Sequence, residues 1–352
     1  MALHGYAQQE GTSPEQLLLK DFRPQSLYQI PQTKITKAKY AAIDLHSHSY
    51  IESPEEVDAW VRTMDSVGVD KTVIMTYQTG PSFDSLVQVY SKYPDRFILF
   101  CGFDYTGYDQ PGYGPAAVKE LERCVQMGAK GVGELGDKGK GLFYSKPTPA
   151  YGMHIDDDRM KPLLDKCGEL GIPISIHVAE PMWMYAAMDS TNDGLMNAYT
   201  WRLDDQPDIL DHDQMVSTLE NAVRDHPNTT FIACHYANCS FNLTMLGQLF
   251  DQYPNLYADN AARYAETAAI PRYVASFYEQ YQDRLVFGTD MGTGSSMYRL
   301  LFRILESEDE HFYQHNQFSY HWALNGYGLS DEVLQKVYRT NAERILNLDA
   351  KK

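Results

Sequence analysis

The stretch Ala41-Ala42-Ile43-Asp44-Leu45-His46-Ser47-His48 joins an apolar run to two histidines that are two residues apart. In an extended strand successive side chains point to opposite faces, so Asp44, His46 and His48 are expected to share one side. Two imidazoles about 6.6–7 Å apart along a strand can converge on one metal ion, because each ring reaches several ångströms. The stretch therefore predicts a strand that ends in a metal site.

The rest of the chain alternates short apolar runs with helical segments. Ser53-Pro54-Glu55-Glu56 has the pattern of a capping box that opens a helix, and Gly68 marks the expected end of that helix. Strands are expected over residues 41–48, 71–76, 96–103, 130–134, 173–177, 230–235, 256–259 and 285–290. Most intervals between strand ends are close to the roughly 30 residues of one strand–helix unit, and eight such units make a (β/α)8 TIM barrel.

A doubly wound open sheet also alternates strands and helices and is the alternative fold. That fold carries a glycine-rich phosphate loop after its first strand. Here the first strand is followed by His-Ser-His-Ser-Tyr, which favours the barrel.

The amino-acid composition is typical of a folded globular protein and argues against two kinds of partner. The 352 residues are 43% hydrophobic and 22% charged, as in a folded globular chain. A net charge of −17 argues against nucleic acid or an anionic membrane as a partner, and no run approaches the ~20 apolar residues of a membrane helix. The five cysteines are an odd number without zinc-finger spacing, which predicts buried thiols and no disulfide framework.

Three segments are expected along the chain. Residues 1–40 are polar, contain Pro24 and Pro31, and form an N-terminal arm that is either packed on the body or partly mobile. Residues 41–347 form the barrel, and residues 348–352 form a C-terminal tail. The first ten residues have neither a basic start nor a long apolar run, so a cytoplasmic protein and one exported after removal of a signal peptide both remain open.

The long interval between His177 and His235 is rich in aromatic residues and methionines, including Met182, Trp183 and Tyr185. Such a loop after the fifth strand suits a lid over a substrate, and it equally suits a contact with a neighbouring subunit. Later, His311, His315 and His321 lie in an aromatic stretch that is expected to be helical, and we interpret them as packing or interface residues.

Polar residues also end four later strands. They are Glu134, His177, His235 and Asp290, and each follows an apolar run. Because TIM barrels bind their ligands at the C-terminal ends of the strands, we expect these side chains to meet His46 and His48.

This pattern resembles the amidohydrolase superfamily. Asp44-x-His46-x-His48 on strand one, histidines on strands five and six, and an aspartate on strand eight carry the resemblance. The tail Thr340-Asn341-Ala342-Glu343-Arg344-Ile345-Leu346 and the stretch Gly-Ile-Pro-Ile-Ser-Ile-His are similar to its amidohydrolase-2 branch. The resemblance covers about residues 41–347. It implies a distorted barrel with one or two divalent metal ions, His46, His48 and His177 as ligands, and Asp290 as ligand and proton shuttle.

Two positions depart from the pattern of the superfamily. Many members carry a carboxylated lysine on strand four, where this chain has Glu134; related hydrolases with a similar strand use the glutamate as a ligand. The resemblance thus implies that Glu134 could bridge two ions, with His235 on the second. Decarboxylases of the branch usually follow the strand-six histidine with Gly-Glu, whereas here Tyr236-Ala237-Asn238 follows, which weakens the decarboxylase interpretation.

The leading functional hypothesis is metal-dependent hydrolysis of a small-molecule amide, lactone or ester. Asp290 would take the proton from a metal-activated water, and His235 would polarise the carbonyl or hold a second ion. The alternative is a lyase that decarboxylates an aromatic or enol acid on a single ion, with Asp290 protonating carbon. A binding protein that has lost its chemistry is a third class, but the full ligand set argues against it.

The mixed nitrogen and oxygen ligands favour zinc, with manganese possible. Five residues are candidates for substrate binding: Arg263, which could hold a carboxylate by a bidentate pair or serve only in a salt bridge, and Glu180, Trp183, Tyr50 and Tyr77. The expected partner is a small molecule, and the aromatic-rich surface makes a homo-oligomer plausible.

Overall fold

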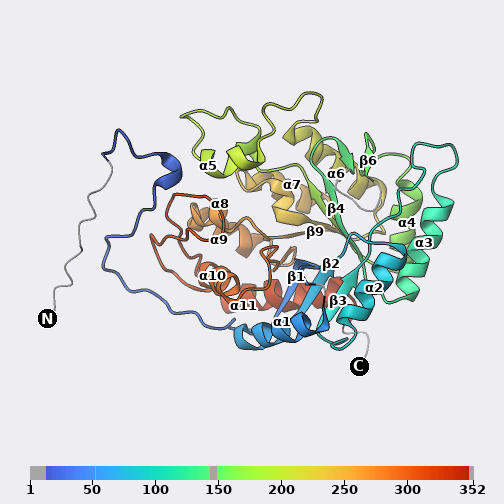
Figure 1. Cartoon of the computed structure of the whole chain (residues 1–352), viewed down its shortest axis with the longest axis horizontal. Coiled ribbons are helices and arrows are strands. Elements are labelled where there is room, and N and C mark those ends of the chain that lie inside the picture. Colours follow the sequence, from blue (N-terminus) through green and yellow to red (C-terminus); the bar gives the residue numbers. More distant parts are fainter. Residues whose placement is uncertain (1–12, 52, 143–148, 349–352) are drawn as a thin grey trace.

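The computed structural model describes residues 13–51, 53–142 and 149–348. Eight parallel strands form the wall of a barrel, with helices packed around it (Figure 1). The strands are β1 (Ala42–His48), β2 (Val69–Met75), β3 (Phe97–Phe100), β4 (Val132–Asp137), β7 (Ile174–Val178), β8 (Phe231–Ala233), β9 (Leu256–Asp259) and β10 (Leu285–Val286). All eight expected strands are present.

Two contacts close the barrel. Strands β1 to β3 form one sheet and β4, β7, β8, β9 and β10 form another. Between β3 and β4, Cys101 forms a parallel bridge with Val132. Between β1 and β10, the backbone N–H of Leu45 donates to the carbonyl of Phe287 at 2.8 Å. The order runs without interruption around the ring, which confirms the barrel and excludes the open sheet.

A helix of ten or more residues follows each strand. These helices are α1 (Pro54–Val67), α2 (Gly80–Tyr90), α3 (Pro115–Gln126), α4 (Lys161–Leu170), α6 (His212–Asp225), α7 (Leu243–Gln252), α9 (Pro271–Gln280) and α10 (Ser295–Glu306). The expected capping box is present: Ser53 accepts from the backbone N–H of Glu56, and the Glu56 side chain accepts from that of Ser53. Gly68 ends α1 in a left-handed conformation, with φ of 81°.

One expectation for β1 is wrong. The pairing of β1 with β2 shifts register between Asp44 and Ser47, and such an irregularity breaks the two-residue alternation. The Asp44 carboxylate accepts from the hydroxyls of Thr289 and of Tyr298 on α10, at 2.7 and 3.2 Å. His46 and His48 instead face Glu134. Asp44 thus anchors the strand to an outer helix and does not share the side of the two histidines.

The segment 307–330 is irregular and not helical, contrary to expectation. Its side chains bond to other elements: the Trp322 indole donates to the carbonyl of Ala265, and Tyr320 donates to Glu266 of α8 (Tyr264–Ala268). These tertiary contacts fix the segment in an irregular conformation, so it does not form a helix. His311 and His315 contact the N-terminal arm, in accordance with a packing role.

The described part of the arm, residues 13–40, runs along one side of the molecule, outside α8, α9 and α10 (Figure 1). Thr33 donates to Asp309 from its backbone N–H and its hydroxyl. A short turn, η1 (Leu19–Asp21), is the single regular element within these residues. All five cysteines are buried and unpaired, as expected. In the described ranges, no helix is both long and apolar enough to cross a membrane.

Candidate metal centre

Six side chains from five strands or strand ends meet at one mouth of the barrel. His46 and His48 come from β1, Glu134 from β4, His177 from β7, His235 from the end of β8 and Asp290 from the turn after β10. Parallel strands in a closed barrel carry their C-terminal ends to the same rim, which is why residues up to 244 positions apart lie in contact. The structure therefore brings together every residue that the sequence nominated as a metal ligand.

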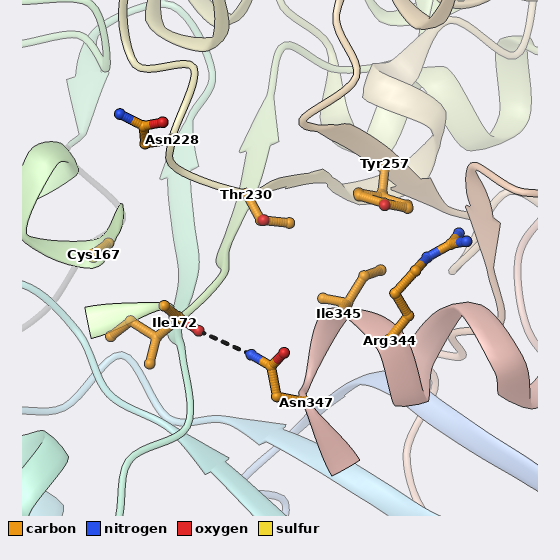
Figure 2. Close-up of a pocket in the computed structure, with 9 residues that line it drawn as sticks. Cys167, Ile172, Asn228, Thr230, Tyr257, Arg344, Ile345 and Asn347 are labelled. Carbon is orange, nitrogen blue, oxygen red and sulfur yellow. Dashed lines mark hydrogen bonds between the residues drawn. The ribbon is translucent and has the colours of Figure 1, made fainter. Parts of the chain in front are cut away.

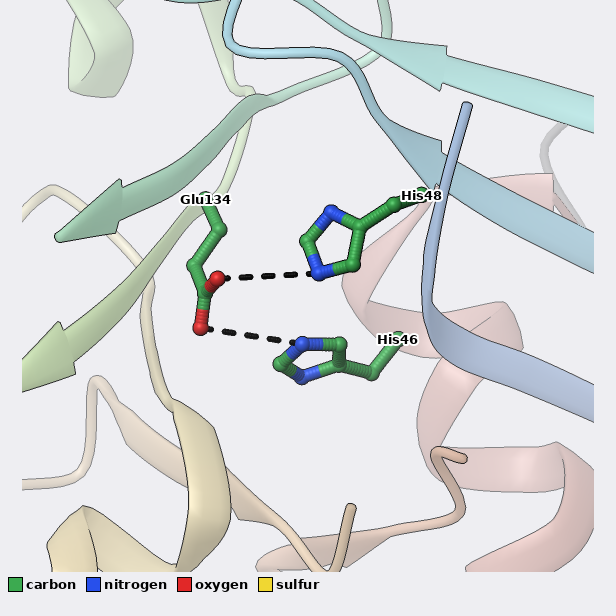
Figure 3. A group of neighbouring side chains, drawn as sticks. All are labelled: His46, His48 and Glu134. Carbon is green, nitrogen blue, oxygen red and sulfur yellow. Dashed lines mark ion pairs between the residues drawn. The ribbon is translucent and has the colours of Figure 1, made fainter. Parts of the chain in front are cut away.

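The carboxylate of Glu134 lies at the centre of this group. Its Oε1 is 3.3 Å from Nδ1 of His177, 3.3 Å from Nε2 of His235 and 3.6 Å from Nε2 of His46. Its Oε2 is 3.6 Å from Nε2 of His48. Figure 3 shows one carboxylate oxygen directed at each of the two rings of β1.

These separations fit ligands of a common ion. Two donors that each lie about 2.0–2.2 Å from a tetrahedral ion are about 3.3–3.6 Å apart. Among the described residues, neither Nε2 of His46 nor Oε1 of Glu134 has a hydrogen-bond partner, although both are buried. Buried polar atoms without partners are costly, and a metal ion between them would satisfy both.

Hydrogen bonds on the far side of each ring set which nitrogen is free to bind metal. His46 donates from Nδ1 to Asp259 at 2.8 Å, and His48 donates from Nδ1 to the Met75 carbonyl at 3.1 Å. His235 donates from Nδ1 to the Ala261 carbonyl at 2.8 Å. A carbonyl only accepts, so in the neutral rings the lone pair lies on Nε2, which faces the centre.

His177 uses the opposite arrangement. Its Nε2 donates to the carbonyl of Ala179 at 2.9 Å, so its lone pair is on Nδ1, the atom that faces Glu134. All four histidines therefore direct an acceptor nitrogen at the same point. Such outer hydrogen bonds orient metal-binding imidazoles and raise their basicity.

The electrostatics of the centre favour added positive charge. Burial opposes protonation of His46, yet the carboxylates of Asp259, Asp290 and Glu134 raise its pKa to about 10. Burial likewise opposes ionisation of Glu134, but His46, His177 and His235 hold the pKa of its carboxyl well below the usual range. A proton on His46 or a divalent ion can supply the charge that these carboxylates require.

Asp290 lies at the rim, where the backbone turns sharply. Its φ is 55°, and its N–H donates to the carbonyl of His46 at 2.9 Å, which ties the turn to β1. Its Oδ1 is 3.0 Å from Nε2 of His48 and accepts from the hydroxyl of Tyr50 at 3.3 Å. Although burial opposes ionisation, His46 and His48 lower the pKa of Asp290, so it is a carboxylate at neutral pH.

A left-handed turn follows β8. His235, Tyr236, Ala237 and Asn238 have φ between 54° and 61°, a conformation that costs non-glycine residues energy and clusters at functional sites. The turn directs the His235 ring at Glu134 and places Asn238 over β7, where its amide donates to the carbonyl of Val178 at 2.8 Å. Asn238 also accepts from Nε of Arg263 at 2.8 Å.

A cavity of about 230 Å³ adjoins the metal-ligand candidates. It is lined by His177, His235 and Asp290 together with Lys138, Glu180, Met184, Asn197, Trp201, Ala262, Arg263 and Phe318. A second cavity of about 400 Å³ shares Lys138, His177, Trp201 and Asp290 with it and reaches His48 and Tyr77. Together the two cavities have the volume that a small-molecule ligand needs.

Charged side chains line the floor of this cavity. Glu180 is buried, forms an ion pair with Lys138 and lies 3.5 Å from Arg263. Burial opposes its ionisation, but His177, Lys138 and Arg263 hold the pKa of its carboxyl far below the usual range. One carboxylate thus faces two cations, and the carboxylate of Asp290 also lines the cavity, so these charges balance before any metal is counted.

The five candidates for substrate binding divide into two groups. Arg263 and Glu180 line the cavity; Tyr77 stacks on His48 with ring centroids 4.9 Å apart, and Tyr50 lies half-exposed at the rim against Asp290. Trp183 does not belong to the described lining. Its indole donates to Asp193 and its ring packs 6.3 Å from that of Trp322, so Trp201 is the aromatic residue that the loop supplies to the cavity.

The loop after β7 covers the cavity. Its short elements η2 (Met182–Met184), α5 (Leu195–Ala198) and η3 (Tyr199–Trp201) supply Met184, Asn197 and Trp201 to the lining. This position agrees with a lid. Tyr199 and Trp201 are also largely exposed, so a contact with another subunit stays a prediction.

Sequence reasoning missed several residues of the site, and four of them bear on its charge, its shape or the position of its ligands. Lys138 and Trp201 line the cavity, and Asp259 and Asn238 hold His46 and Arg263. Asp259 ends an apolar strand as the other site residues do, and that signal could have found it. The remaining three lie in loops, whose course the sequence pattern does not specify.

A separate cavity of about 210 Å³ lies at the opposite end of the barrel (Figure 2). Its lining includes Cys167, Ile172, Thr230 and Arg344, and the Asn347 amide closes one side by donating to the Gly171 carbonyl at 3.3 Å. It contains none of the metal-ligand candidates. In TIM barrels this end serves stability, and catalysis takes place at the other.

Solved structures with the same fold include three decarboxylases. The 2,6-dihydroxybenzoate decarboxylase from Rhizobium is 17% identical, with a TM-score of 0.54 over 88% of this chain and 99% of its own. A dihydroxybenzoic acid decarboxylase from Polaromonas sp. with bound manganese and 2-nitroresorcinol is 16% identical, with a TM-score of 0.57 over 88% and 98%. The 5-carboxyvanillate decarboxylase from Novosphingobium aromaticivorans, complexed with manganese, is 15% identical, with a TM-score of 0.53 over 90% and 100%.

At these identities the likeness establishes the TIM-barrel fold and not the reaction. Among curated proteins, no sequence matches the chain. The sequence model of the amidohydrolase family matches residues 43–348, which span all eight strands and every nominated ligand. The chain is therefore a member of the amidohydrolase family.

Proposed function

We propose that this protein is a metal-dependent lyase that decarboxylates, without oxidation, a small hydroxylated aromatic or enolic acid. The observation that carries the proposal is the pair of cationic side chains, Lys138 and Arg263, which both contact Glu180 in the cavity beside the metal-ligand candidates. An acid substrate needs such a site, because its carboxylate must be bound next to the ion in a largely buried space.

The chain's own residues can hold both the ion and the acid. His46, His48, His177, Glu134 and Asp290 would ligate a divalent ion, manganese or zinc. That ion would supply Lewis-acid chemistry, which stabilises the charge that develops as carbon dioxide leaves or, in a hydrolase, activates water. Arg263 would hold the substrate carboxylate, with its guanidinium kept in place by Asn238 at 2.8 Å.

Asp290 would move the proton. Its low pKa makes it a carboxylate at the start, so Oδ1 can accept the proton of the substrate hydroxyl and then return it to carbon. In the balanced step one C–C bond to the carboxyl breaks and one C–H bond forms. Carbon dioxide is released, and no oxidant or reductant is needed.

The three decarboxylases of similar fold act on hydroxybenzoate-type acids, and two of them hold manganese. This likeness supports the substrate class by analogy of fold. The turn that follows His235 differs from the Gly-Glu of decarboxylases in this branch, so the residues around the substrate are expected to differ as well.

The test is carbon dioxide release by the full chain loaded with manganese or zinc. Hydroxybenzoic acids and β-keto or enol acids are the substrates, and the matching esters, lactones and amides are assayed for hydrolysis in parallel. We expect carbon dioxide from at least one acid, with kcat/KM reduced roughly 10–150-fold in Arg263→Gln, because a charge-assisted pair is worth about 1.5–3 kcal/mol.

Arg339→Gln is the matched control, since Arg339 pairs with Asp70 and Glu343 away from the cavity. It should leave kcat/KM unchanged. A hydrolysed product without carbon dioxide would refute the lyase and favour the second candidate function.

That second candidate is hydrolysis of an amide, lactone or ester, and the position of Glu134 favours it. Oε1 lies near His46, His177 and His235 and Oε2 near His48, so Glu134 would hold two ions together with these histidines. Binuclear centres of this kind are common in hydrolases. In that reaction Asp290 would take the proton of the attacking water.

Metal content per chain separates the two arrangements. Elemental analysis is made on the wild type and on Glu134→Ala. If the protein is the lyase, we expect one ion per chain in the wild type. Close to two ions in the wild type, falling towards one in Glu134→Ala, would favour the hydrolase. No bound metal after reconstitution would refute both.

A further inference from the structure

The loop after β7 presents to the cavity an uncharged polar side chain that the proposed reaction does not use. Asn197, on α5, belongs to the cavity lining and is buried, at 6% exposure. Its amide nitrogen Nδ2 donates to the hydroxyl oxygen of Tyr320 at 2.9 Å. Tyr320 comes from the segment 307–330 and is not part of the described lining of either cavity. The nitrogen end of the amide is thus bound by a residue outside the cavity.

The hydrogen of the Tyr320 hydroxyl sets the direction of this bond. That hydroxyl donates to Oε1 of Glu266 at 2.5 Å, and Glu266 is itself buried on α8. A phenol has one hydrogen, so the Tyr320 oxygen can only accept from Asn197. The amide must therefore turn Nδ2, and not Oδ1, towards Tyr320. Because α8 begins next to Arg263, the same short helix carries the arginine of the cavity and the end of this chain of hydrogen bonds.

The other end of the amide is open to the cavity. Among the described residues, none donates a hydrogen bond to Oδ1 of Asn197, and this atom is not one of the enclosed polar atoms that lack a partner. An atom that is neither paired nor enclosed, on a residue that lines the cavity, can be reached by a ligand there. An amide oxygen only accepts, so the ligand has to supply the hydrogen. A hydroxyl or an amino group can do so, and a fluorine or an ether oxygen cannot.

The other polar side chains of the described lining already have a part in the proposed function or cannot play this one. The metal-ligand candidates would hold the ion, and the charged group of Lys138, Glu180 and Arg263 would hold the carboxylate of the acid. Trp201 has an indole N–H, which only donates. Asn197 therefore offers an acceptor for a part of the ligand that neither the ion nor the cations contact.

We infer that Asn197 is a specificity-determining residue, which selects an acid that carries a second hydrogen-bond donor. The substrate then has three polar groups: the carboxylate beside Arg263, the hydroxyl at the ion, and a further hydroxyl or amino group that donates to Oδ1 of Asn197. Tyr320 and Glu266 are positioning residues, because they keep the amide from turning over. The inference rests on the proposed function for the way in which the carboxylate and the first hydroxyl are held.

The test is the affinity of the full chain, loaded with zinc, for a matched series of acids, measured by titration calorimetry. The probes are 2-hydroxybenzoates that carry a hydroxyl, an amino group or a fluorine at position 3, 4, 5 or 6. Fluorine is close to a hydroxyl in size and cannot donate. At one position or more, we expect the hydroxy and the amino acid to bind about 5–10-fold more tightly than the fluoro acid, which is the range that one hydrogen bond supplies. For acids that are decarboxylated, the ratio of kcat/KM replaces that of the dissociation constants.

Two variants connect the preference to these hydrogen bonds. Asn197→Ala removes the acceptor, and Tyr320→Phe removes the oxygen that holds Nδ2, so in each the preference should fall below about 2-fold. The matched control is Tyr327→Phe, since the Tyr327 hydroxyl also joins the segment 307–330 to α8, by donating to Thr267 at 2.7 Å. It should keep the preference of the wild type, although it loses a hydrogen bond of the same kind. Circular dichroism checks each fold, and Tyr320→Phe decides the outcome if Asn197→Ala does not fold.

Three results would overturn the inference. The first is equal affinity for the three substituents at every position in the wild type. The second is a preference for the hydroxy but not the amino acid, because a hydroxyl can also accept from Nδ2 and the amide would then be turned the other way. The third is a preference that persists in Asn197→Ala or Tyr320→Phe, or that is lost equally in Tyr327→Phe.

These results are separate from the test of the lyase. Carbon dioxide release with equal kcat/KM for all three substituents would overturn the role of Asn197 and leave the proposed function in place. A donor preference in binding without release of carbon dioxide would support the role of Asn197 and count against the lyase. If none of these acids binds, the role of Asn197 is refuted, while β-keto and enol acids still test the lyase.

Discussion

Replacement of Asp259 by asparagine is expected to weaken metal binding without disturbing the fold. Asp259 Oδ2 accepts from Nδ1 of His46 at 2.8 Å, while Oδ1 accepts from the backbone N–H groups of His235 and Ala261 at 2.8 and 3.0 Å. Two backbone donors at Oδ1 require the oxygen of the new amide to take that place. Its NH2 group then faces His46, where it can only donate.

The donated hydrogen bond changes the tautomer of His46. Nδ1 must accept, so in the neutral ring the hydrogen moves to Nε2, the atom that faces Glu134 at 3.6 Å. A protonated Nε2 cannot bind an ion. Loss of an outer partner of a metal-binding histidine typically lowers affinity 10–100-fold, or about 1.4–2.7 kcal/mol.

The loss of metal affinity in Asp259→Asn depends on pH. In the metal-free wild type, burial opposes protonation of His46, but Asp259, Asp290 and Glu134 raise its pKa to about 10. At pH 7 an ion must therefore displace a proton from the wild type. Asp259→Asn removes one of the charges that hold this proton, which partly offsets the loss of affinity. The difference in metal affinity between the wild type and Asp259→Asn should thus be smallest near pH 7 and grow towards pH 10.

Competition with a chromophoric chelator at pH 7, 8.5 and 10 measures the dissociation constant. Asp165→Asn is the matched control, because Asp165 contacts Nδ1 of His226 at 2.7 Å in the same way but outside the metal centre. It should leave affinity unchanged. Equal affinities of Asp259→Asn and wild type at every pH, or an equal loss in Asp165→Asn, would refute this reasoning.

Three other changes test the fold and the centre. Ser53→Ala removes the cap and capping box of α1 and should destabilise the protein by about 1 kcal/mol in urea unfolding, with metal affinity unchanged; an unaltered midpoint would contradict the role of the cap. Gly288→Ala places a Cβ 2.7 Å from that of His46. Chelator competition should therefore detect weaker metal binding, and urea unfolding should detect a loss of stability of about 1–3 kcal/mol. Wild-type metal affinity and wild-type stability would mean that β1 can shift freely. The folded-state pKa of His46, about 10, exceeds its ordinary value of 6.5, so this group stabilises the metal-free fold below pH 6.5 and that contribution is lost as the pH rises to about 10. The thermal midpoint in chelator should fall over this interval more steeply than that of the metal-loaded protein, and parallel profiles would contradict the assignment.

The barrel and most of the centre could be predicted because both follow from local pattern. Apolar runs at intervals of one strand–helix unit indicate eight parallel strands, and a polar residue that ends such a run lies at the rim. His46, His177, His235 and Asp290 were found by this rule. The capping box of α1 is also local, since it depends on Ser53 and Glu56 three residues apart.

Other features depend on contacts that spacing does not encode. The register shift in β1 turns Asp44 towards Tyr298, because an outer helix offers its carboxylate a hydroxyl. The stretch around Trp322 was expected to be helical but is irregular, with side-chain bonds to α8. Trp183 and Trp201 belong to one loop, and the packing of that loop alone selects Trp201 for the cavity.

By itself the sequence determined the order of the strands, the side chains at their ends and hence the family and the candidate metal ligands, since these rest on residue type and periodicity. The tertiary structure alone decided that Glu134 lies among all four histidines, that Asp259 orients His46, and that Lys138 and Arg263 share Glu180. The physical reason is closure of the barrel: it converts positions far apart in the chain into distances of 3–4 Å, and loop packing then selects which side chains enter the cavity.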